Sequence, residues 1–304
     1  MASSQTSLPV LRVAILTSGG DAPGMNAIVA GACERVEELG GAAVGVTGGF
    51  AGLAARRFRP VAAAEAGAHA DAPGTWLQSS RWTALATDEG RRECLEGLRA
   101  SGAGALLVVG GHGSALGARA LAAHVPVAFV PATIDGDIKG TEATVGMDSA
   151  VAYGVDAVGR LRVTGHALPG RGFVLQTLGA PTGLLAEAVA AAAGVRDVLV
   201  PERAHDLGEV ALRLRDGART GEGIVVMSEA VGDAVAVAAA LADRAGIRVH
   251  PTILGHAQRA ATPTERDRVM GEAAGRAAIG ALAGGRSAFV AIGADRAPRV
   301  TPLV

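Results

Sequence analysis

Short apolar runs recur along the chain, and each of them ends abruptly in small or polar residues. Because consecutive positions are apolar, these runs suit strands that are covered on both faces, as in a parallel sheet. The predicted strands lie at residues 13–16, 105–109, 127–130, 173–176, 224–227 and 289–292.

Alanine-rich segments of helical length separate several of these runs. The clearest are residues 183–194 and 233–246, and Asp233 is placed to cap the first turn of the second helix. The alternation of strands and helices predicts an α/β protein of doubly wound architecture with a largely parallel sheet. Ligands in this class bind at the carboxyl ends of the strands, so we expect the site residues there.

Composition narrows the class of protein further. The chain has 304 residues, 49% hydrophobic and 19% charged, so it can bury a large core in one or two domains. Its net charge is −1 and Lys139 is its single lysine, so no basic block favours a nucleic acid or an anionic membrane as a partner.

Cysteine usage and the N-terminal segment bear on the compartment. Cys33 and Cys94 lie far apart without metal-ligand spacing, which argues against a disulfide framework or a structural zinc site and fits a reducing cytoplasm. The opening segment MASSQTSLPV lacks the pattern of a signal peptide, and no run of about 18 apolar residues follows. We therefore expect a soluble, cytoplasmic protein.

Two glycine-rich stretches follow predicted strands. Residues 16–27, LTSGGDAPGMNA, pass through a turn into a helix that we expect to begin near Gly24, and residues 106–121, LLVVGGHGSALGARAL, place Ser114 at a helix start. Backbone amides and the helix dipole at such junctions suit a phosphate. The first stretch is also compatible with an ordinary strand-to-helix turn, and it matches neither GxGxxG nor the Walker sequence.

Two further stretches hold charged side chains. In residues 131–141, PATIDGDIKGT, Asp135 and Asp137 are two residues apart, so one carboxylate can take a proton while the other orients a hydroxyl or a metal-bound water. In residues 253–263, ILGHAQRAATP, His256 and Arg259 are three apart and would share one helical face. Taken singly, the first is more often a solvated turn and the second a surface pair.

Together and in this order, TSGGDAPGMNA, GGxGS, TIDxDIxGT and LGHxQR resemble the signatures of the phosphofructokinase family. The resemblance implies two doubly wound α/β domains: a larger donor-binding domain, residues 1–147 plus 259–304, and a smaller sugar-phosphate domain, residues 148–258. It also implies a homo-oligomer, a tetramer or a dimer, with sugar-phosphate sites between subunits. The implied reaction moves a phosphoryl group from ATP, or in some members from pyrophosphate, to the 1-hydroxyl of fructose 6-phosphate or a related sugar metabolite, with Mg²⁺ as the metal.

The resemblance assigns roles on the acceptor side. Asp135 matches the general base of the family, beside Thr133 and Asp137. The expected acceptor-binding groups are Glu229 for a sugar hydroxyl, His256 and Arg259 for the phosphate, and, from a neighbouring subunit, Arg171 together with His250, which replaces a second arginine.

The donor side matches the family at several small residues and one arginine. The expected donor-binding residues are Gly19, Gly20, Arg81, Gly111, Gly113 and Ser114. Gly113 and Ala132 stand where members that use pyrophosphate typically have aspartate and lysine, so these small residues favour ATP.

Two residues depart from the family pattern. His112 replaces the aspartate of GGDGS that helps to hold Mg²⁺, and in the segment LGAPTG, residues 178–183, Leu178 keeps its expected acceptor contact while Ala180 replaces an arginine. Loss of an arginine that stabilises a phosphoryl transition state typically costs about 10³ to 10⁵ in rate. Replacing a carboxylate by imidazole changes the local charge by one unit if the histidine is neutral and by two units if it is protonated. Each unit charge changes the interaction energy by about 4 kcal/mol for groups 4 Å apart at an effective dielectric of about 20.

His112 has several open interpretations. Mg²⁺ prefers oxygen ligands, so imidazole either recruits a softer metal or, when protonated, contacts a donor phosphate and replaces part of the charge lost at Ala180. A phosphohistidine intermediate is a further possibility. The remaining interpretation is relaxed selection, which makes the chain a catalytically impaired, sugar-phosphate-binding or regulatory homologue.

The regulatory and C-terminal parts also depart from the family. Ala30 and Glu34 occupy positions where many members have arginines for a nucleotide effector, so we expect that site not to function. The sequence ends at TPLV soon after the last predicted strand, without the last helices of the family, which leaves closure of that end of the larger domain open.

Overall fold

The structure is a computed structural model that describes residues 11–303, and the opening segment MASSQTSLPV lies outside the described residues. The chain divides into two compact units. Unit 1 comprises Met1–Thr133, Ile138–Gly146 and Thr262–Val304, and unit 2 comprises Ile134–Asp137 and Met147–Ala261. Within residues 11–303, no helix combines the length and the apolar character that crossing a membrane requires.

Unit 1 is built on one eight-stranded sheet, ordered β12-β11-β5-β4-β1-β2-β3, with β6 paired to β5. The pairs among β2, β1, β4, β5 and β11 are parallel, whereas β3 and β12 pair antiparallel at the two edges. Every residue of β4 and β5 is buried, as expected for strands covered on both faces. The strands are β1 (Arg12–Ser18), β2 (Ala42–Val46), β3 (Phe58–Val61), β4 (Ala105–Gly110), β5 (Val127–Thr133), β6 (Val145–Gly146), β11 (Ala288–Ile292) and β12 (Pro298–Pro302).

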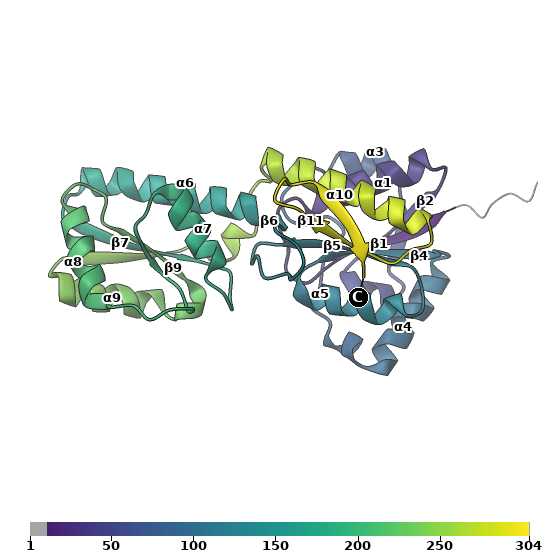
Figure 1. The fold of residues 1–304 in the computed structure, drawn as a ribbon, viewed down its shortest axis with the longest axis horizontal. Helices are drawn as coiled ribbons and strands as arrows, with labels where there is room; N and C mark the ends of the chain where they lie inside the picture. The colour runs from purple at the N-terminus through teal and green to yellow at the C-terminus, as the bar shows by residue number, and fades with distance from the viewer. Residues whose placement is uncertain (1–10, 304) are drawn as a thin grey trace, which may run out of the picture. The chain divides into compact units, whose positions relative to one another are not determined.

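Helices cover both faces of this sheet: α1, α3 and α10 lie on one side, and α4 and α5 on the other (Figure 1). Glycines let α1 and α10 pack with their backbones in contact, because a Cβ at Gly275 would overlap the carbonyl oxygen of Ile28, and one at Gly31 that of Glu272. The helices are α1 (Met25–Glu38), α2 (Gly49–Ala54), α3 (Ala63–Gly67), α4 (Asp88–Ala100), α5 (His112–Ala122), α10 (Glu265–Ala283) and the 3₁₀ helix η1 (Thr83–Ala86).

Unit 2 is built on a four-stranded parallel sheet, ordered β10-β7-β9-β8. Helices α6 and α7 cover one face of the sheet, and α8 and α9 cover the other (Figure 1). Its strands are β7 (Arg171–Thr177), β8 (Asp197–Leu199), β9 (Ile224–Ser228) and β10 (Arg248–Ile253). Its helices are α6 (Met147–Ala167), α7 (Leu184–Ala193), α8 (Leu207–Ala218), α9 (Ala234–Ala245) and the 3₁₀ helices η2 (Glu229–Val231) and η3 (Gly255–Gln258).

The structure confirms the six predicted strands, which fall within β1, β4, β5, β7, β9 and β11. It also confirms both predicted helices as α7 and α9, and Asp233 caps α9 by accepting a 2.9 Å hydrogen bond from the backbone N–H of Val235. The pattern missed the six other strands that the structure describes within residues 11–303. β3, β10 and β12 are edge strands with exposed residues, and β6 and β8 are very short, so none of them has a long apolar run; β2 combines Ala, Gly and Val.

The units differ in detail from the predicted boundaries 1–147, 148–258 and 259–304. The segment Ile134–Asp137, expected in the larger domain, groups with unit 2, and Met147 and the residues from Arg259 to Ala261 do the same. Gly136 explains the first difference: it has a φ of 68°, and a Cβ there would lie 3.0 Å from Sδ of Met147 in α6. The turn between Asp135 and Asp137 therefore packs against the first residue of α6, which belongs to unit 2.

The two cysteines are free and fully buried, Cys33 in α1 and Cys94 in α4. Burial raises the pKa of each thiol from 9.0 to about 12, with smaller contributions from nearby acidic side chains, Glu37 for Cys33 and Glu93 for Cys94.

We predict that neither thiol of the native protein reacts with a thiol reagent at pH 8, although both react once the chain is unfolded. The unfolded thiols lose their protons near pH 9, whereas the native ones keep them to about pH 12. This contribution to stability is therefore complete below pH 9 and is lost as the pH rises toward 12. Urea titrations at pH 8 and pH 10.5 measure the free energy of unfolding. Between these two pH values it should fall more for wild type than for a variant carrying both Cys33→Ala and Cys94→Ala. An equal fall in the two proteins would contradict the contribution of the buried thiols.

Candidate active site

The predicted donor-binding residues of unit 1 gather at the carboxyl edge of its sheet. Ser18 of β1 pairs with Gly110 of β4, and Gly110 pairs with Pro131 of β5, so the loops that follow these strands are neighbours. Gly111 and Thr133 confirm this adjacency, because a Cβ at Gly111 would lie 3.5 Å from the Cβ of Thr133. This is the edge at which ligands bind in sheets of this class.

Arg81 is brought to this edge by hydrogen bonds of the two serines that precede it. The backbone N–H of Gly19 donates to the carbonyl of Ser80 at 3.2 Å, and the hydroxyl of Ser79 donates to the carbonyl of Gly19 at 2.8 Å. Arg81 itself is exposed. The backbone before Arg81 is therefore held next to the glycine turn that ends at Gly24, the N-cap of α1 with a φ of 84°.

Helix α5 begins at His112, two residues before the start expected at Ser114, with Gly111 as its N-cap. His112 and Gly113 are exposed in the first turn, where N–H groups and the helix dipole favour an anion. Ser114 is buried and its hydroxyl donates to the carbonyl of Ser18 at 3.0 Å. Its side chain thus ties α5 to β1, a structural role that the sequence did not indicate.

These residues do not offer Mg²⁺ a protein carboxylate at the position where the family has one. The first turn of α5 presents the imidazole of His112, and Mg²⁺ takes oxygen ligands. Within residues 11–303, no three histidine, cysteine, aspartate or glutamate side chains form a group that could hold a metal ion. A Mg²⁺ ion held by one or two carboxylates and the donor phosphates would therefore take its protein oxygens from a segment other than the first turn of α5.

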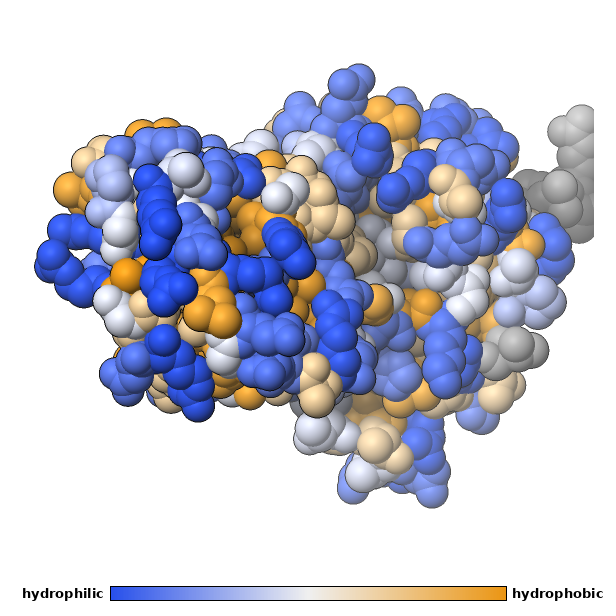
Figure 2. Space-filling model, turned by 60° about the vertical axis from the view of Figure 1, so that its left-hand side comes forward, coloured by the Kyte–Doolittle hydropathy of each residue, from blue (hydrophilic) through white to orange (hydrophobic). Residues whose placement is uncertain are grey.

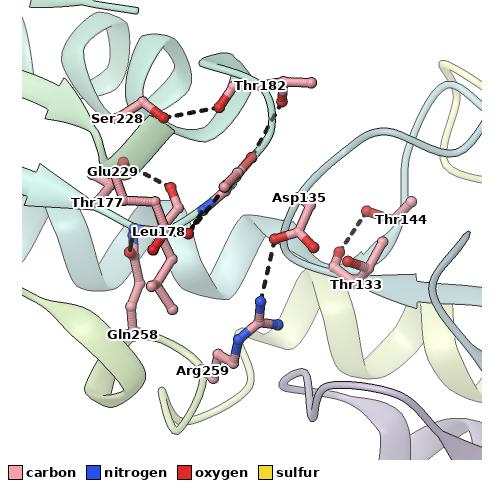
Figure 3. A network of polar contacts seen from close by, with 12 residues as sticks. Thr133, Asp135, Thr144, Thr177, Leu178, Thr182, Ser228, Glu229, Gln258 and Arg259 are labelled. Carbon is pink, nitrogen blue, oxygen red and sulfur yellow. Dashed lines mark hydrogen bonds and ion pairs between the residues drawn. The ribbon is translucent and has the colours of Figure 1, made fainter. Parts of the chain in front are cut away.

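In unit 2, Glu229 follows β9 and is held by the loop that follows β7, residues 178–183. Its Oε1 accepts hydrogen bonds from the backbone N–H groups of Gly179 and Ala180, both at 3.1 Å (Figure 3). No hydrogen bond of the described residues involves the second oxygen, Oε2. Glu229 thus has a fixed orientation and one carboxylate oxygen available to a ligand hydroxyl.

The loop of residues 178–183 is braced from several sides. Beyond the bonds to Glu229, the hydroxyl of Ser228 donates to the carbonyl of Thr182 at 2.9 Å, and the N–H of Gly183 donates to Glu202 at 2.8 Å. The N–H of Leu178 donates to the side chain of Gln258 at 2.9 Å. Ala180 is exposed on this fixed backbone, so the position of the missing arginine is retained although its side chain is not.

Asp135, the predicted general base, pairs with Arg259, the predicted phosphate-binding arginine. Nη2 of Arg259 lies 3.4 Å from Oδ1 of Asp135, and both side chains are largely buried, at 13% and 21% exposure (Figure 3). A neighbouring guanidinium favours the ionised carboxylate, which is the form that can accept a proton. Asp137, two residues on, is half-buried.

His256 and Arg259 occur at a 3₁₀ turn, η3, and not on the α-helical face that their spacing suggested. The N–H of Arg259 donates to the carbonyl of His256 at 3.0 Å. In a 3₁₀ turn, residues three apart lie one above the other, so the two side chains start from the same side of the turn. His256 is exposed, which leaves its imidazole accessible to an anion.

Arg171 and His250 lie away from the carboxyl edge of the unit 2 sheet, contrary to the expectation that site residues come from strand ends. Arg171 is the first residue of β7, and His250 pairs with Phe173 in the edge strand β10. Thr177, at the other end of β7, pairs with Ser228, the residue before Glu229. Six residue steps of about 3.3 Å separate Arg171 from Thr177 by about 20 Å. One chain therefore does not bring Arg171 to its own Glu229.

The surface of α1 around Glu34, where the family resemblance led us to expect no working effector site, carries ion pairs. Glu34 and Glu38 of α1 both pair with Arg276 of α10, at 2.7 Å each. Hydrogen bonds from Arg35 and Arg276 hold the pKa of Glu38 below its usual value. The exposed side of α1 thus presents carboxylates satisfied within unit 1.

Comparison with known proteins identifies the family. The family model described as Phosphofructokinase matches residues 12–282. The chain belongs to the phosphofructokinase family. The ATP-dependent 6-phosphofructokinase 1 of Thermus thermophilus is 35% identical over 298 residues, covering 96% of this chain and 92% of that protein. The ATP-dependent 6-phosphofructokinase of Lactobacillus delbrueckii subsp. bulgaricus is 38% identical over 279 residues, covering 90% and 87%.

Solved structures of phosphofructokinases share the fold. Pichia pastoris phosphofructokinase in the T-state gives a TM-score of 0.88 at 25% identity, covering 97% of this chain but only 35% of that longer chain. A pyrophosphate-dependent phosphofructokinase from Marinobacter aquaeolei gives a TM-score of 0.83 at 21% identity, covering 97% and 83%. These matches confirm the predicted phosphofructokinase-like fold class, and the family relationship places the chain among phosphotransferase enzymes.

Proposed function

We propose that this phosphofructokinase homologue transfers a phosphoryl group from ATP to the 1-hydroxyl of fructose 6-phosphate or a closely related sugar phosphate. The observation that supports it most is the arrangement in unit 2, where the Asp135–Arg259 pair and the oriented Glu229 supply a base, a cation and a hydroxyl acceptor. His256 adds a second phosphate-binding group beside Arg259.

Each side chain has a role in this proposal that its chemistry suits. Oδ1 of Asp135 accepts the proton of the attacking hydroxyl. Arg259 and His256 bind the 6-phosphate by charge-assisted hydrogen bonds, and Oε2 of Glu229 accepts a sugar hydroxyl. The donor phosphates bind the exposed first turn of α5 and Arg81 in unit 1, with Gly19, Gly20 and Gly111 admitting close approach.

ATP is the donor that the small residues favour. Nothing lies within 4 Å of a Cβ built on Gly113, so this position leaves open space, and Ala132 is fully buried. A coupled assay of the purified chain with ATP or pyrophosphate, against several sugar phosphates, tests the proposal directly. Fructose bisphosphate formed from ATP supports it; turnover with pyrophosphate alone overturns the donor assignment.

A second candidate is a homologue that binds the acceptor without efficient catalysis. His112 and Ala180 favour it, because they remove a carboxylate and an arginine from the donor side while the acceptor residues of unit 2 remain. Fructose 6-phosphate binding, measured by calorimetry, without turnover for any donor would establish this alternative.

We further propose that the active protein is a homo-oligomer, a dimer or a tetramer, in which Arg171 completes the acceptor site of a neighbouring copy. The separation of about 20 Å along β7 is longer than an arginine side chain, which supports this arrangement. The ligands expected are small sugar phosphates and a phosphoryl donor, and buried free cysteines suit a cytoplasmic setting.

We predict that two inactive variants restore activity when mixed. Arg171→Ala and Glu229→Gln should each lose most acceptor affinity, because each removes a charged group from every site. After unfolding and refolding together, mixed oligomers contain some sites with both wild-type residues, so activity should return. Mixing without subunit exchange is the control. No recovery, or full acceptor affinity in a monomeric form, would contradict a shared site.

A further inference from the structure

We propose that Gln258 is a positioning residue for acceptor binding, which fixes the turn that holds Arg259 against the loop that holds Glu229. Gln258 is fully buried in η3, immediately before Arg259. It lies within the LGHxQR signature, yet its residue type gives no indication of a site role. The inference rests on the proposed function, because it concerns the same acceptor site.

Both ends of the Gln258 amide have a backbone partner. Its Oε1 accepts from the N–H of Leu178 at 2.9 Å (Figure 3), and its Nε2 donates to the carbonyl of Ala150 in α6 at 3.1 Å. Only this orientation of the amide satisfies both partners, because the reversed one would set donor against donor and acceptor against acceptor. A buried amide with both ends satisfied holds one conformation, since leaving either end unpaired is costly.

These bonds join segments that are distant in sequence and that each hold an acceptor-site group. Leu178 precedes Gly179 and Ala180, whose N–H groups hold Glu229, and Gln258 precedes Arg259, which pairs with Asp135. The hydrogen bond between Gln258 and Leu178 therefore joins the residue next to Arg259 to the residue next to Gly179. Fixing it fixes the spacing between the proposed phosphate-binding cation and the proposed hydroxyl acceptor.

The outer surface of unit 2 contrasts with this fixed interior. Charged and polar residues cover much of the face seen in Figure 2, with scattered apolar residues between them. The polar contacts that set the acceptor groups lie instead on buried side chains, Gln258 at 0% exposure and Ser228 at 0%. A substitution at Gln258 therefore changes contacts inside unit 2, among them the bond to the backbone of the loop that holds Glu229.

Two variants grade the loss of these bonds. Gln258→Met keeps a similar length but removes both hydrogen bonds. Gln258→Glu keeps an acceptor for the N–H of Leu178. When ionised it sets a buried charge against the carbonyl of Ala150, whereas its protonated form can donate to that carbonyl. Its acceptor affinity relative to wild type should therefore be low at neutral pH and recover in part as the pH is lowered. If the methionine variant fails to fold, as judged by circular dichroism and gel filtration, this pH dependence provides the test, and its absence would contradict the positioning role.

Asn26 provides a matched control in unit 1. It is 1% exposed, its Oδ1 accepts from the N–H of Trp76 at 3.0 Å, and its Nδ2 donates to the carbonyl of Ala72 at 3.0 Å. Asn26→Leu removes the same two kinds of bond from a buried amide. It should lower thermal stability as Gln258→Met does, without changing the affinity for fructose 6-phosphate measured in the absence of a donor.

The decisive measurement is the dissociation constant of fructose 6-phosphate by calorimetry, together with hydrogen exchange of the loop of residues 178–183. We expect Gln258→Met to weaken binding by about 10- to 100-fold, to speed exchange at Leu178 and to raise KM for the acceptor but not for ATP. A folded Gln258→Met with wild-type acceptor affinity would overturn the positioning role alone. Wild-type protein that binds no sugar phosphate would overturn the proposed function as well.

Discussion

Restoring both family residues, His112→Asp together with Ala180→Arg, should raise turnover with ATP by about 10³ to 10⁵ over wild type, the range expected for an arginine that stabilises a transferring phosphoryl group. The structure supports the experiment because Ala180 is exposed on a loop whose backbone is fixed by Glu229, Ser228 and Glu202. Because Ala180 is exposed, a longer side chain there can extend into solvent, and His112 is exposed in the first turn of α5.

The single variants should gain far less than the double variant. Ala180→Arg alone supplies the arginine without the carboxylate, and His112→Asp alone supplies the carboxylate without the arginine, so we expect the effects to be non-additive. The measurement is kcat for all four proteins with ATP and with pyrophosphate. His112→Ala is the control for the imidazole: if it matches wild type with every donor, His112 has no catalytic part. A double variant no better than wild type would contradict the donor-side argument.

Asp135→Asn should lower kcat by about 10² to 10⁴ while fructose 6-phosphate still binds, because an amide cannot accept the proton of the attacking hydroxyl. The replacement keeps the shape of the side chain, and its oxygen can still accept from Arg259, 3.4 Å away in the wild-type protein. Steady-state kinetics and calorimetry on the same preparation separate the loss of turnover from any loss of binding.

Asp156→Asn is the matched control for Asp135→Asn. Asp156 is an exposed carboxylate of unit 2 that also pairs with an arginine, Arg160, at 2.6 Å. An exposed pair of this kind contributes little to stability, so this variant should behave as wild type in both measurements. Unchanged turnover of Asp135→Asn would remove Asp135 from the mechanism, and equal losses in both variants would indicate a general effect of charge.

Much of the fold follows from local patterns in the sequence. Runs apolar on both faces indicated the central strands, because burial on both sides leaves no room for alternation. Asp233 marked the start of α9, and the structure shows that Gly194 and Gly246, the last residues of the two predicted segments, end α7 and α9 in the left-handed conformation. Edge strands such as β10 escaped prediction because one side of each is exposed, so no long apolar run forms.

The sequence also determined which chemical groups are present at the candidate site, since two of the four signatures contain Asp135, His256 and Arg259, and the family resemblance adds Glu229. Only the tertiary structure decided what each group contacts. It paired Asp135 with Arg259, assigned Ser114 to a brace between α5 and β1, placed Arg171 at the far end of β7 and revealed the bonds of Gln258. These contacts join residues separated by 80 or more positions, such as Leu178 and Gln258, or depend on strand direction. Periodicity and capping report only neighbours along the chain, whereas such contacts arise from the packing of whole elements.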